Sequence, residues 1–521
     1  MPVDRIREIA AKNNEPEAFQ VLSDREPGVS WFQQLFAIDL RALAVLRILL
    51  AGICIGFVFV QFSYIEVLYT DDGILPRPIN QQMLGDGFWS LMWFNDTEGF
   101  ARTILIFTSL AACVFALGFQ TKIMNFALLV LVWSIQVRNP LVLTGGDILL
   151  RMLLFWTLFL PLNGTWSFDS VRGGEDREKG WKVASIGSAA IMLQLVYMYF
   201  FTGLAKLNPF WLNGDAMEYA MQLEMSVKPL GEWLAGMPGL MKFATVATLV
   251  AEISTLFLIF VPRMHHFNRG MLLGFFLMFH IGIWLTMSIG IFSITAIAAW
   301  VIFIPSDIWN MWLGTPVGYS EKRFHKPEFL TLDRVLQIVA AVFLVSVTLQ
   351  NLVMALGPET SRKLAIVELF GRSTMTVQQF HMFSKPPLYS PWFEYNAQLD
   401  SGERVDVFDS KRRNTNLKPP SIYTYMQSQN WRRIHWNLIT HPLYPPESES
   451  VYTAVRERLL QAAVDRWNQE HLADPVIKAE LLCHLEPIKL DRIESEQPQF
   501  ENHDTPHDVV WAAYNKDKSE E

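Results

Sequence analysis

Nine long apolar segments lie between residues 38 and 356 and constrain the fold more than any other feature of the chain. A helix that crosses a bilayer needs about 20 mostly apolar residues. Segments of that kind lie at about 40–62, 102–120, 122–140, 146–163, 185–207, 240–262, 268–286, 289–309 and 334–356. The sequence therefore predicts a polytopic α-helical membrane protein with about nine transmembrane helices.

The distribution of Lys and Arg predicts the orientation of these helices, because short cytoplasmic loops carry an excess of basic residues. With the N-terminus inside, the inner side holds Arg5, Arg7, Lys12, Arg25, Lys122, Arg172, Arg177, Lys179, Lys182, Arg263, Arg269, Lys322, Arg323 and Lys326. The opposite loops are poor in basic residues. We therefore expect a multi-pass protein of the cytoplasmic (inner) membrane, with its N-terminus inside and its C-terminus outside.

Changes in polarity along the chain predict its domain organisation. We expect a cytoplasmic segment at 1–37, a transmembrane domain at 38–312, a cytoplasmic loop at 313–333, a final transmembrane helix at 334–356, an extracytoplasmic α+β domain at 357–500 and a flexible acidic tail at 501–521. In the α+β domain, Asp400-Ser401-Gly402 between two alternating patterns predicts a hairpin. Tyr452–Glu470 has the pattern of an amphipathic helix, and VIKAELLCHLEPI alternates like a strand.

Two segments are expected to cover the outer face of the membrane domain. The aromatic segment 64–100 is typical of a re-entrant or interfacial element, and 208–240 contains a short amphipathic helix. Together they would roof a cavity with Lys206 at its floor. Lys206 stands near the end of the apolar run 191–211, where an ammonium either snorkels to water or loses its proton and becomes a base. The residue pattern alone leaves both roles open.

Other ionisable side chains inside the predicted helices are candidates for substrate binding or for structural roles. Asp147 and Arg151 stand four residues apart, so we expect them to form an ion pair. Glu252 lies centrally in its helix and must find a partner or stay neutral. Arg138 lies near the end of the third predicted helix. His280 has no local partner, and a lone His on an apolar face is more often part of the core than a catalyst.

The rest of the sequence argues against several classes of function. The net charge of −8 disfavours nucleic acid as a partner. No Ser-His-Asp arrangement, phosphate-binding loop or metal-ligand cluster is evident, and the three Cys lie far apart. A transporter is disfavoured as well, because the chain has no convincing internal repeat.

The segment around Lys206 resembles a known family. YFFTGLAKLNPFWLNGDAMEY is similar to the segment of vitamin K-dependent gamma-glutamyl carboxylases that carries their catalytic lysine, and MFHIGIWLTMSIGIFS is similar to their segment with a functional histidine. RALAVLRILL, YTDDGILPRP and WSFD resemble the wider horizontally transferred transmembrane (HTTM) domain family. The resemblance covers about residues 30–310 and is weaker from Gln378 on.

This resemblance implies an activity and a set of reactants. Lys206, as a free amine, would deprotonate vitamin K hydroquinone or another quinol, and reaction with O2 would generate a strong alkoxide base. That base would take a γ-proton from a peptidyl glutamate, and the carbanion would add CO2. His280 would orient or stabilise an anionic intermediate. The partner would be a glutamate-containing peptide or secreted protein, and no metal is implied.

The sequence departs from the carboxylases before the fourth predicted helix. Where they carry an Asn-His pair, which is thought to position the glutamate, this chain has Thr144-Gly145-Gly146-Asp147. Gly145-Gly146-Asp147 with Arg151 is instead similar to bacterial proteins of the HTTM family. One alternative is therefore a non-carboxylating HTTM membrane protein that acts in the maturation or export of a secreted peptide. Another quinone-dependent redox reaction is a further alternative.

Overall fold

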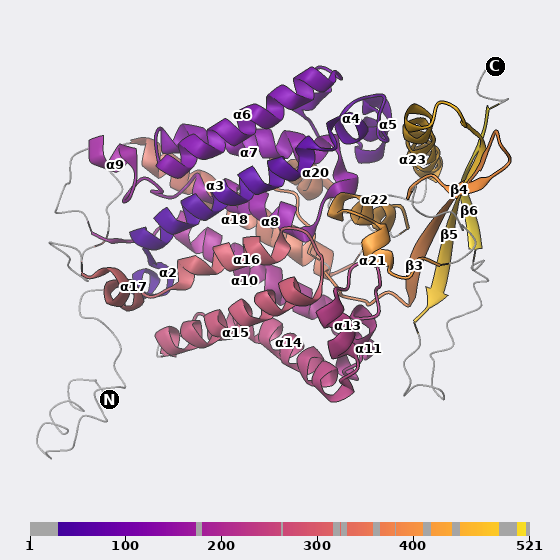
Figure 1. The fold of residues 1–521 in the computed structure, drawn as a ribbon. Helices are drawn as coiled ribbons and strands as arrows, with labels where there is room; N and C mark the ends of the chain where they lie inside the picture. The colour runs from indigo at the N-terminus through magenta and orange to yellow at the C-terminus, as the bar shows by residue number, and fades with distance from the viewer. Residues whose placement is uncertain are drawn as a thin grey trace, which may run out of the picture.

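Long helices form a bundle, and a small sheet domain sits at one end of it (Figure 1). The computed structural model describes residues 30–172, 180–261, 264–315, 324, 331–357, 365–380, 382–409, 418–439, 449–488 and 508–516. Most of the expected loop at 313–333 and of the tail at 501–521 lies outside these residues, as does the N-terminal segment up to residue 29. The first described helix, α2 (Trp31–Phe36), lies at the end of the bundle remote from the sheet (Figure 1).

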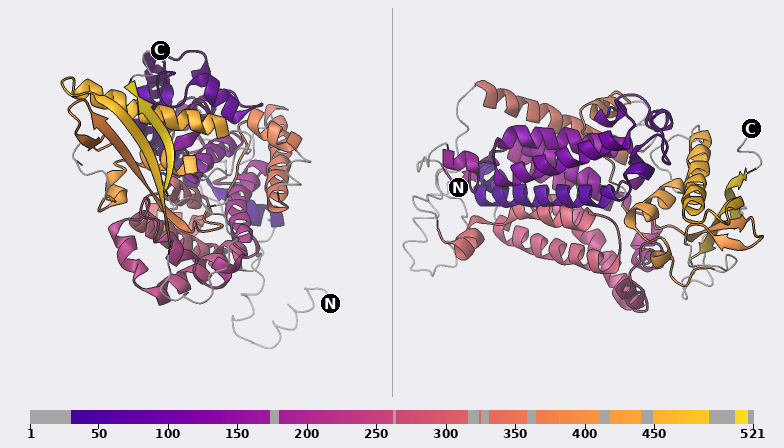
Figure 2. Two further views of the ribbon diagram at one scale, coloured as in Figure 1. Left: turned by 90° about the vertical axis from the view of Figure 1, so that its right-hand side faces the viewer. Right: turned by 45° about the horizontal axis from the view of Figure 1, so that its top comes forward.

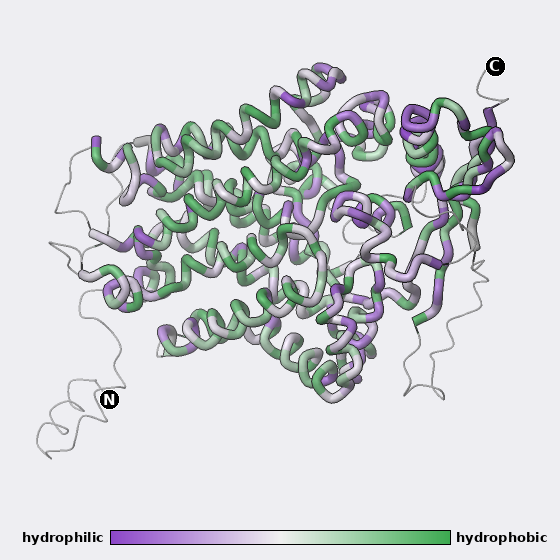
Figure 3. Tube along the Cα trace, viewed as in Figure 1, coloured by the Kyte–Doolittle hydropathy of each residue, from purple (hydrophilic) through white to green (hydrophobic). Residues whose placement is uncertain are grey.

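Among the residues that the structure describes, seven helices are long and apolar enough to cross a membrane. They are α3 (Leu40–Phe62), α6 (Glu98–Leu117), α7 (Thr121–Arg138), α10 (Ile186–Ala205), α14 (Pro238–Leu258), α15 (His265–Thr286) and α18 (Thr331–Ala355). Apolar side chains such as Phe59, Phe107 and Met278 are exposed along them, and polar residues gather at the helix ends and in the sheet domain (Figure 3). Exposed apolar surface on this scale needs lipid to cover it, so the chain is a multi-pass membrane protein.

The fourth predicted transmembrane helix is instead a short helix in the protein core. α8 (Gly145–Thr157) has 13 residues, and nearly all of them are buried by other helices. Hydropathy cannot separate a helix that faces lipid from one that other helices surround, which explains the difference. α8 packs on α16 (Phe292–Trp300), and Gly146 permits this because a Cβ there would lie 2.4 Å from the backbone N of Phe292.

The eighth predicted helix, 289–309, is broken. α16 continues as η5 (Val301–Phe303), and the chain then turns by 96° into α17 (Ser306–Leu313). Pro305 explains the break, because proline lacks an N–H and forces the residue before it out of the helical conformation. Ile304 is accordingly extended. The described chain thus has seven continuous candidate spans, or eight if the bent pair counts as one, instead of nine.

Short elements cover the end of the bundle that faces the sheet. The first outer segment, 64–100, forms α4 (Ile65–Tyr69), α5 (Arg77–Leu84) and η2 (Leu91–Trp93). The second outer segment, 208–240, forms α11 (Pro209–Leu212), α12 (Ala216–Ala220) and α13 (Pro229–Ala235). At other points of the bundle lie η3 (Pro140–Val142), α9 (Phe168–Arg172) and the short strands β1 (Ile38–Asp39) and β2 (Lys182–Val183), which pair with each other.

A four-stranded antiparallel sheet forms the centre of the C-terminal domain (Figure 2). Its order is β4 (Arg404–Asp406), β3 (Tyr389–Leu399), β5 (Val476–Pro487) and β6 (Asp508–Asn515). The predicted hairpin at Asp400-Ser401-Gly402 joins β3 to β4, with Gly402 at φ +85°. Helices α21 (Ile422–Tyr425), α22 (Gln429–Ile439) and α23 (Glu449–Glu470) complete the described domain. α20 (Ala365–Ser373) packs instead on α18 of the bundle.

The tail predicted at 501–521 contains a strand. Asp508–Asn515 pairs with β5 along its outer edge, and the Trp511 ring packs 4.9 Å from the Phe393 ring. The tail is acidic overall, but VVWAAY is a run of residues that favour strands. The C-terminal domain therefore extends beyond the predicted boundary at residue 500.

The C-terminal domain packs directly on the outer segments of the bundle. Residues of α4, α5, β3, β5 and α23 share one hydrophobic cluster. Arg458 of α23 donates hydrogen bonds of 3.0 Å to the carbonyls of Asp71 and Gly73, and Arg433 of α22 donates one of 2.8 Å to the Leu143 carbonyl. These contacts fix the sheet domain against the membrane domain.

We predict that His435 makes the C-terminal domain sensitive to acid. Its ring is buried, Nδ1 lies 2.7 Å from the Trp431 carbonyl and Nε2 lies 2.7 Å from the Tyr395 hydroxyl. Burial lowers the pKa of His435 to about 4, whereas an unfolded chain protonates it near 6.5. The unfolded state therefore binds one more proton between these values. Stability should fall by about 1.4 kcal/mol per pH unit as pH drops through this window and level off below it.

The unfolding midpoint of the full chain, measured from pH 7 to pH 4, checks this prediction. His435→Gln should reduce the slope by about one proton, although it also lowers stability by removing a partner of Tyr395. His471→Gln, which replaces a partly exposed histidine of the same domain, is the matched substitution for comparison. Equal slopes in the wild-type chain and in His435→Gln would show that another group causes the acid sensitivity.

Candidate functional site

Lys206 and Glu252 form a buried ion pair in the membrane domain. Lys206 Nζ lies 2.6 Å from Glu252 Oε1 and 2.7 Å from Oε2, and each side chain is only 4% exposed. The Trp211 ring centroid lies 4.7 Å from Nζ, so the ammonium faces an aromatic surface as well. Glu252 thus has the partner that its central position requires, and Lys206 does not snorkel to water.

The positions of α10 and α14 explain how these two residues meet. Lys206 is the C-cap of α10, whereas Glu252 stands fourteen residues, about 21 Å, from the first residue of α14. Gly203 lets the helices approach, because a Cβ there would lie 3.1 Å from Glu252 Cβ and 2.9 Å from Ile253 Cγ1. The pair therefore lies beneath the short outer helices and is almost fully enclosed, whereas the sequence led us to expect Lys206 at the floor of a cavity.

A segment of the C-terminal region lies across the bundle beside this pair; it is extended at 376–380 and turns at 382–384. We call residues 376–380 and 382–384 the strap. Alternate residues Thr376, Gln378 and Phe380 are buried, as expected for an extended chain with one face inward. The strap follows α20 and leads to the first strand of the sheet domain.

Side chains of the bundle hold the strap by hydrogen bonds. The donors and acceptors are Arg151 Nη2 to Val377 O, Gln194 Nε2 to Gln378 Oε1 (2.6 Å), Thr202 Oγ1 to Phe380 O (3.2 Å), Trp211 Nε1 to Phe383 O (2.9 Å) and Asn208 Nδ2 to Ser384 O (2.7 Å). Most of these contacts go to backbone carbonyls, so they hold the backbone of the strap with little regard to its side chains. Asn208 Oδ1 is buried and has no hydrogen-bond partner in the described structure.

His280 has its own partners and is not hydrogen-bonded to Lys206. Its Nε2 lies 2.6 Å from the Tyr199 hydroxyl, which accepts a hydrogen bond of 2.9 Å from Trp300 Nε1. The Tyr199 hydroxyl can donate its proton to Nε2, and the imidazole proton then lies on Nδ1. That atom is buried without a partner among the described residues. Tyr199 lies seven residues before Lys206, about 10 Å along α10.

Asp147 and Arg151 do not form the ion pair that their spacing predicts. The Asp147 carboxylate accepts hydrogen bonds of 2.6 Å from the Thr144 N–H and hydroxyl, which caps α8. Arg151 instead donates to Gln136 Oε1 at 2.9 Å, contacts the strap, and lies 4.9 Å from the Trp133 ring centroid. The helix N-terminus competes successfully for the carboxylate because its free N–H groups need an acceptor.

Arg138 anchors the first outer segment. Its guanidinium is fully buried and donates hydrogen bonds to the carbonyls of Leu75 (2.6 Å) and Thr70 (2.8 Å). Asp71 Oδ1 lies 3.4 Å away. Burial alone would raise the pKa of the Asp71 carboxyl, but hydrogen bonds from Arg77 and its charge outweigh this and hold the pKa below its ordinary value. The role of Arg138 visible here is structural.

The structure thus brings together only two of the six candidate residues. It also adds Tyr199, Asn208, Trp211 and the strap, which the sequence analysis did not single out. Asn208 and Trp211 lie within the recognised segment GLAKLNPFW, so their proximity to Lys206 along the chain was a usable signal. Nothing local indicated that residues near 380 would reach α10, because the contact joins segments about 180 residues apart.

These features define a class of protein: a multi-pass α-helical membrane protein with a buried Lys–Glu pair and a C-terminal sheet domain. A family model described as HTTM domain matches residues 37–309, just over half of the chain. The chain therefore belongs to the HTTM domain family. No curated protein and no solved structure matches this sequence.

Proposed function

We propose that this protein is a membrane enzyme that uses the Lys206–Glu252 pair to accept a proton from a lipid-soluble quinol. The observation that carries the proposal is the geometry of the pair, in which both carboxylate oxygens lie within 2.7 Å of Nζ. Moving one proton from the ammonium to the carboxylate leaves a neutral amine and a neutral acid. This exchange costs little separation of charge in a buried site and makes the amine available as a base.

The residues around the pair fit a quinol in one specific respect. Asn208 Oδ1 is a buried acceptor without a donor, two residues from Lys206, and buried polar atoms without partners are uncommon in folded proteins. A quinol hydroxyl would supply the missing donor, and Trp211 offers an aromatic face. Trp211 and Asn208 also hold Phe383 and Ser384 of the strap. Entry of a quinol ring would therefore require that end of the strap to move.

The reaction proposed is carboxylation of peptidyl glutamate. A bound quinol would supply a hydroxyl proton and, with O2, the driving force for removing a γ-proton from glutamate, which then takes up CO2. Lys206 would hold the first proton and Glu252 would relay it. His280, with its Nδ1 proton unused, would donate a hydrogen bond to a developing negative charge. In this proposal the sheet domain is extracytoplasmic and meets the peptide, and the membrane is the cytoplasmic one.

Incorporation of radiolabelled bicarbonate into a glutamate-containing peptide tests the proposal. The full chain in lipid nanodiscs would receive vitamin K hydroquinone, O2 and the peptide. We expect quinol-dependent incorporation that falls at least a hundredfold in Lys206→Ala, in line with the loss of general-base catalysis, and also falls in Glu252→Gln. Lys242→Ala removes an exposed lysine from the same helix as Glu252 and should retain activity. Equal incorporation by Lys206→Ala and the wild-type chain would exclude the mechanism.

The strap and the role of Asp147 as the cap of α8 favour a second function, which is the binding of a peptide without carboxylation. The groups that hold the strap already bind the backbone carbonyls of a polypeptide segment, and Asp147 caps α8 where carboxylases carry a histidine. A protein that holds a secreted peptide during maturation or export, without carboxylating it, would need only these features. Co-purification of a secreted protein whose mass is not increased by CO2, together with no bicarbonate incorporation, would support this alternative.

A further inference from the structure

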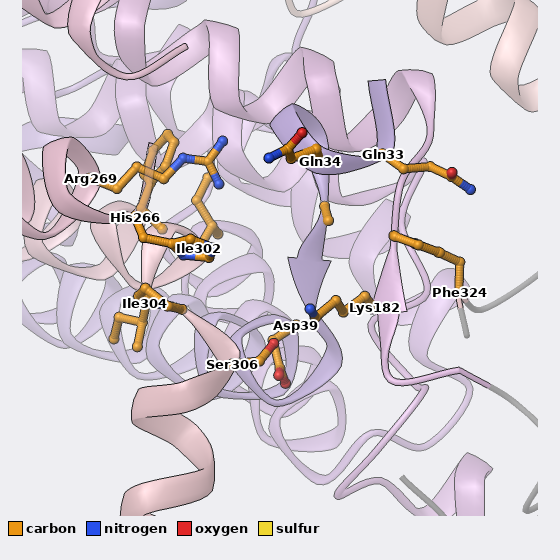
Figure 4. Close-up of a pocket in the computed structure, with 13 residues that line it drawn as sticks. Gln33, Gln34, Asp39, Lys182, His266, Arg269, Ile302, Ile304, Ser306 and Phe324 are labelled. Atoms are coloured by element: carbon orange, nitrogen blue, oxygen red, sulfur yellow. The ribbon is translucent and has the colours of Figure 1, made fainter. Parts of the chain in front are cut away.

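A polar cavity lies at the end of the bundle remote from the sheet domain (Figure 4). Its volume is about 80 Å³, whereas about 10–15 Å³ admits a single water. It therefore has room for a small polar group. Side chains from α2, β2 and α15 line it, among them Gln33, Gln34, Lys182, His266 and Arg269. β2 precedes α10, so about 30 Å of helix separates this cavity from Lys206.

The charge in this cavity is positive. Arg269 is nine-tenths buried, and hydrogen bonds to the carbonyls of Leu35 and Ile259 hold its guanidinium in place. Lys182 Nζ donates to no acceptor among the described residues. Asp39 also lines the cavity, but Arg41 neutralises it through contacts of 2.7 and 2.9 Å. Two cations without a matching anion create a site for an anionic group.

The elements beside the cavity have the character of a membrane interface. α17 lies at 96° to the helix before it and exposes Met311 (74%) and Trp312 (60%). α2 exposes Trp31 and Phe32. Short helices that carry exposed aromatic residues beside basic ones are typical of segments that lie in the headgroup region. The cavity is therefore at the depth of phospholipid headgroups, with apolar surface on both sides for acyl chains.

We propose that this cavity binds the phosphate of an anionic phospholipid in the leaflet remote from the sheet domain. Arg269 and Lys182 would contact the phosphate oxygens, and the amide of Gln33 would donate to them. Basic pockets between membrane helices recognise such headgroups in this way. A phospholipid with a cationic headgroup should bind less well, because Asp39 is already paired and no other described carboxylate lines the cavity.

Native mass spectrometry of the delipidated full-length protein, titrated with phosphatidylglycerol, tests the proposal. We expect phosphatidylglycerol to bind at least tenfold more tightly than phosphatidylcholine and to raise the midpoint of thermal unfolding. Lys182→Gln should weaken phosphatidylglycerol binding about tenfold, the size expected for one charge-assisted hydrogen bond. Lys122→Gln, an exposed lysine at the same end of the bundle, should change it little.

Further experiments distinguish a phospholipid from free phosphate as the bound anion and test whether each variant folds. Lys182→Gln loses no described hydrogen bond, so it should fold, whereas Arg269→Gln also loses structural contacts and needs a check of its unfolding midpoint. The same stabilisation by inorganic phosphate alone would show an anion site that does not select lipid and would overturn the proposal. Equal binding of both phospholipids, or unchanged binding in Lys182→Gln, would overturn it as well.

Discussion

Replacing Glu252 with leucine is expected to destabilise the folded protein by about 3–5 kcal/mol, because it leaves the Lys206 ammonium buried without a counter-charge. Lys206→Met should cost a similar amount for the converse reason. The double variant Lys206→Met/Glu252→Leu should recover most of the loss, since replacing both members of a buried pair by apolar residues is often neutral or stabilising. The measurement is the free energy of unfolding in detergent micelles for the wild-type chain and the three variants.

An exposed ion pair provides the matched control for this cycle. Arg102 and Glu98 stand four residues apart on α6, and each is about half exposed. Their single and double replacements should each change stability by less than about 1 kcal/mol. If the Lys206/Glu252 double variant were as unstable as the single ones, the pair would owe its effect to packing and not to charge. A stable double variant would also show whether loss of activity is separate from loss of fold.

Arg138→Met is expected to lower the free energy of unfolding by about 3–5 kcal/mol. The substitution removes two hydrogen bonds from a charged group and leaves the buried carbonyls of Thr70 and Leu75 without donors. Arg138→Lys should give a smaller loss, since an ammonium cannot span both carbonyls as the planar guanidinium does. Hydrogen exchange measured by mass spectrometry should show faster exchange in 64–93 in both variants, beyond any change in global stability.

Arg77→Met is the comparison for this second prediction. Arg77 is partly exposed and donates hydrogen bonds to Asp71 and to the Trp93 carbonyl. Arg77→Met should therefore cost less stability than Arg138→Met and should increase hydrogen exchange in 64–93 by less. Unchanged exchange in 64–93 after Arg138→Met would mean that the hydrophobic cluster alone holds the outer segment in place.

Much of the helical architecture could be predicted from apolar runs, and the failure at the fourth predicted helix has a different origin from the proline break in the eighth. Runs such as 40–62 and 102–120 contain helices that face lipid, so hydropathy identified them. The run 146–163 is also apolar, but other helices cover it, and α8 is short. Hydropathy measures how strongly a side chain avoids water, and both a lipid environment and a protein interior keep water away from it.

The candidate site was harder to predict, because its residues come together through tertiary contacts. Lys206 and Glu252 are both recognisable as ionisable residues in apolar helices, but their pairing depends on how far α14 extends past the end of α10. The Asp147–Arg151 spacing favoured an ion pair, and the capping requirement of α8 overrode it. Local spacing thus indicated which side chains matter, and only the packing of helices determined their partners.

The strap has a consequence for the order in which the protein is made. Arg151 contacts Val377, a residue 226 positions later in the chain, and Asn208 contacts Ser384 across 176 positions. The interior of the bundle therefore cannot reach its final arrangement while its helices are being inserted one by one. Until synthesis reaches the strap, Arg151, Gln194 and Asn208 lack these partners, and long-range contacts of this kind form slowly. Completion of the Lys206 region is thus a late, post-insertion step that couples the membrane part to the emergence of the C-terminal domain.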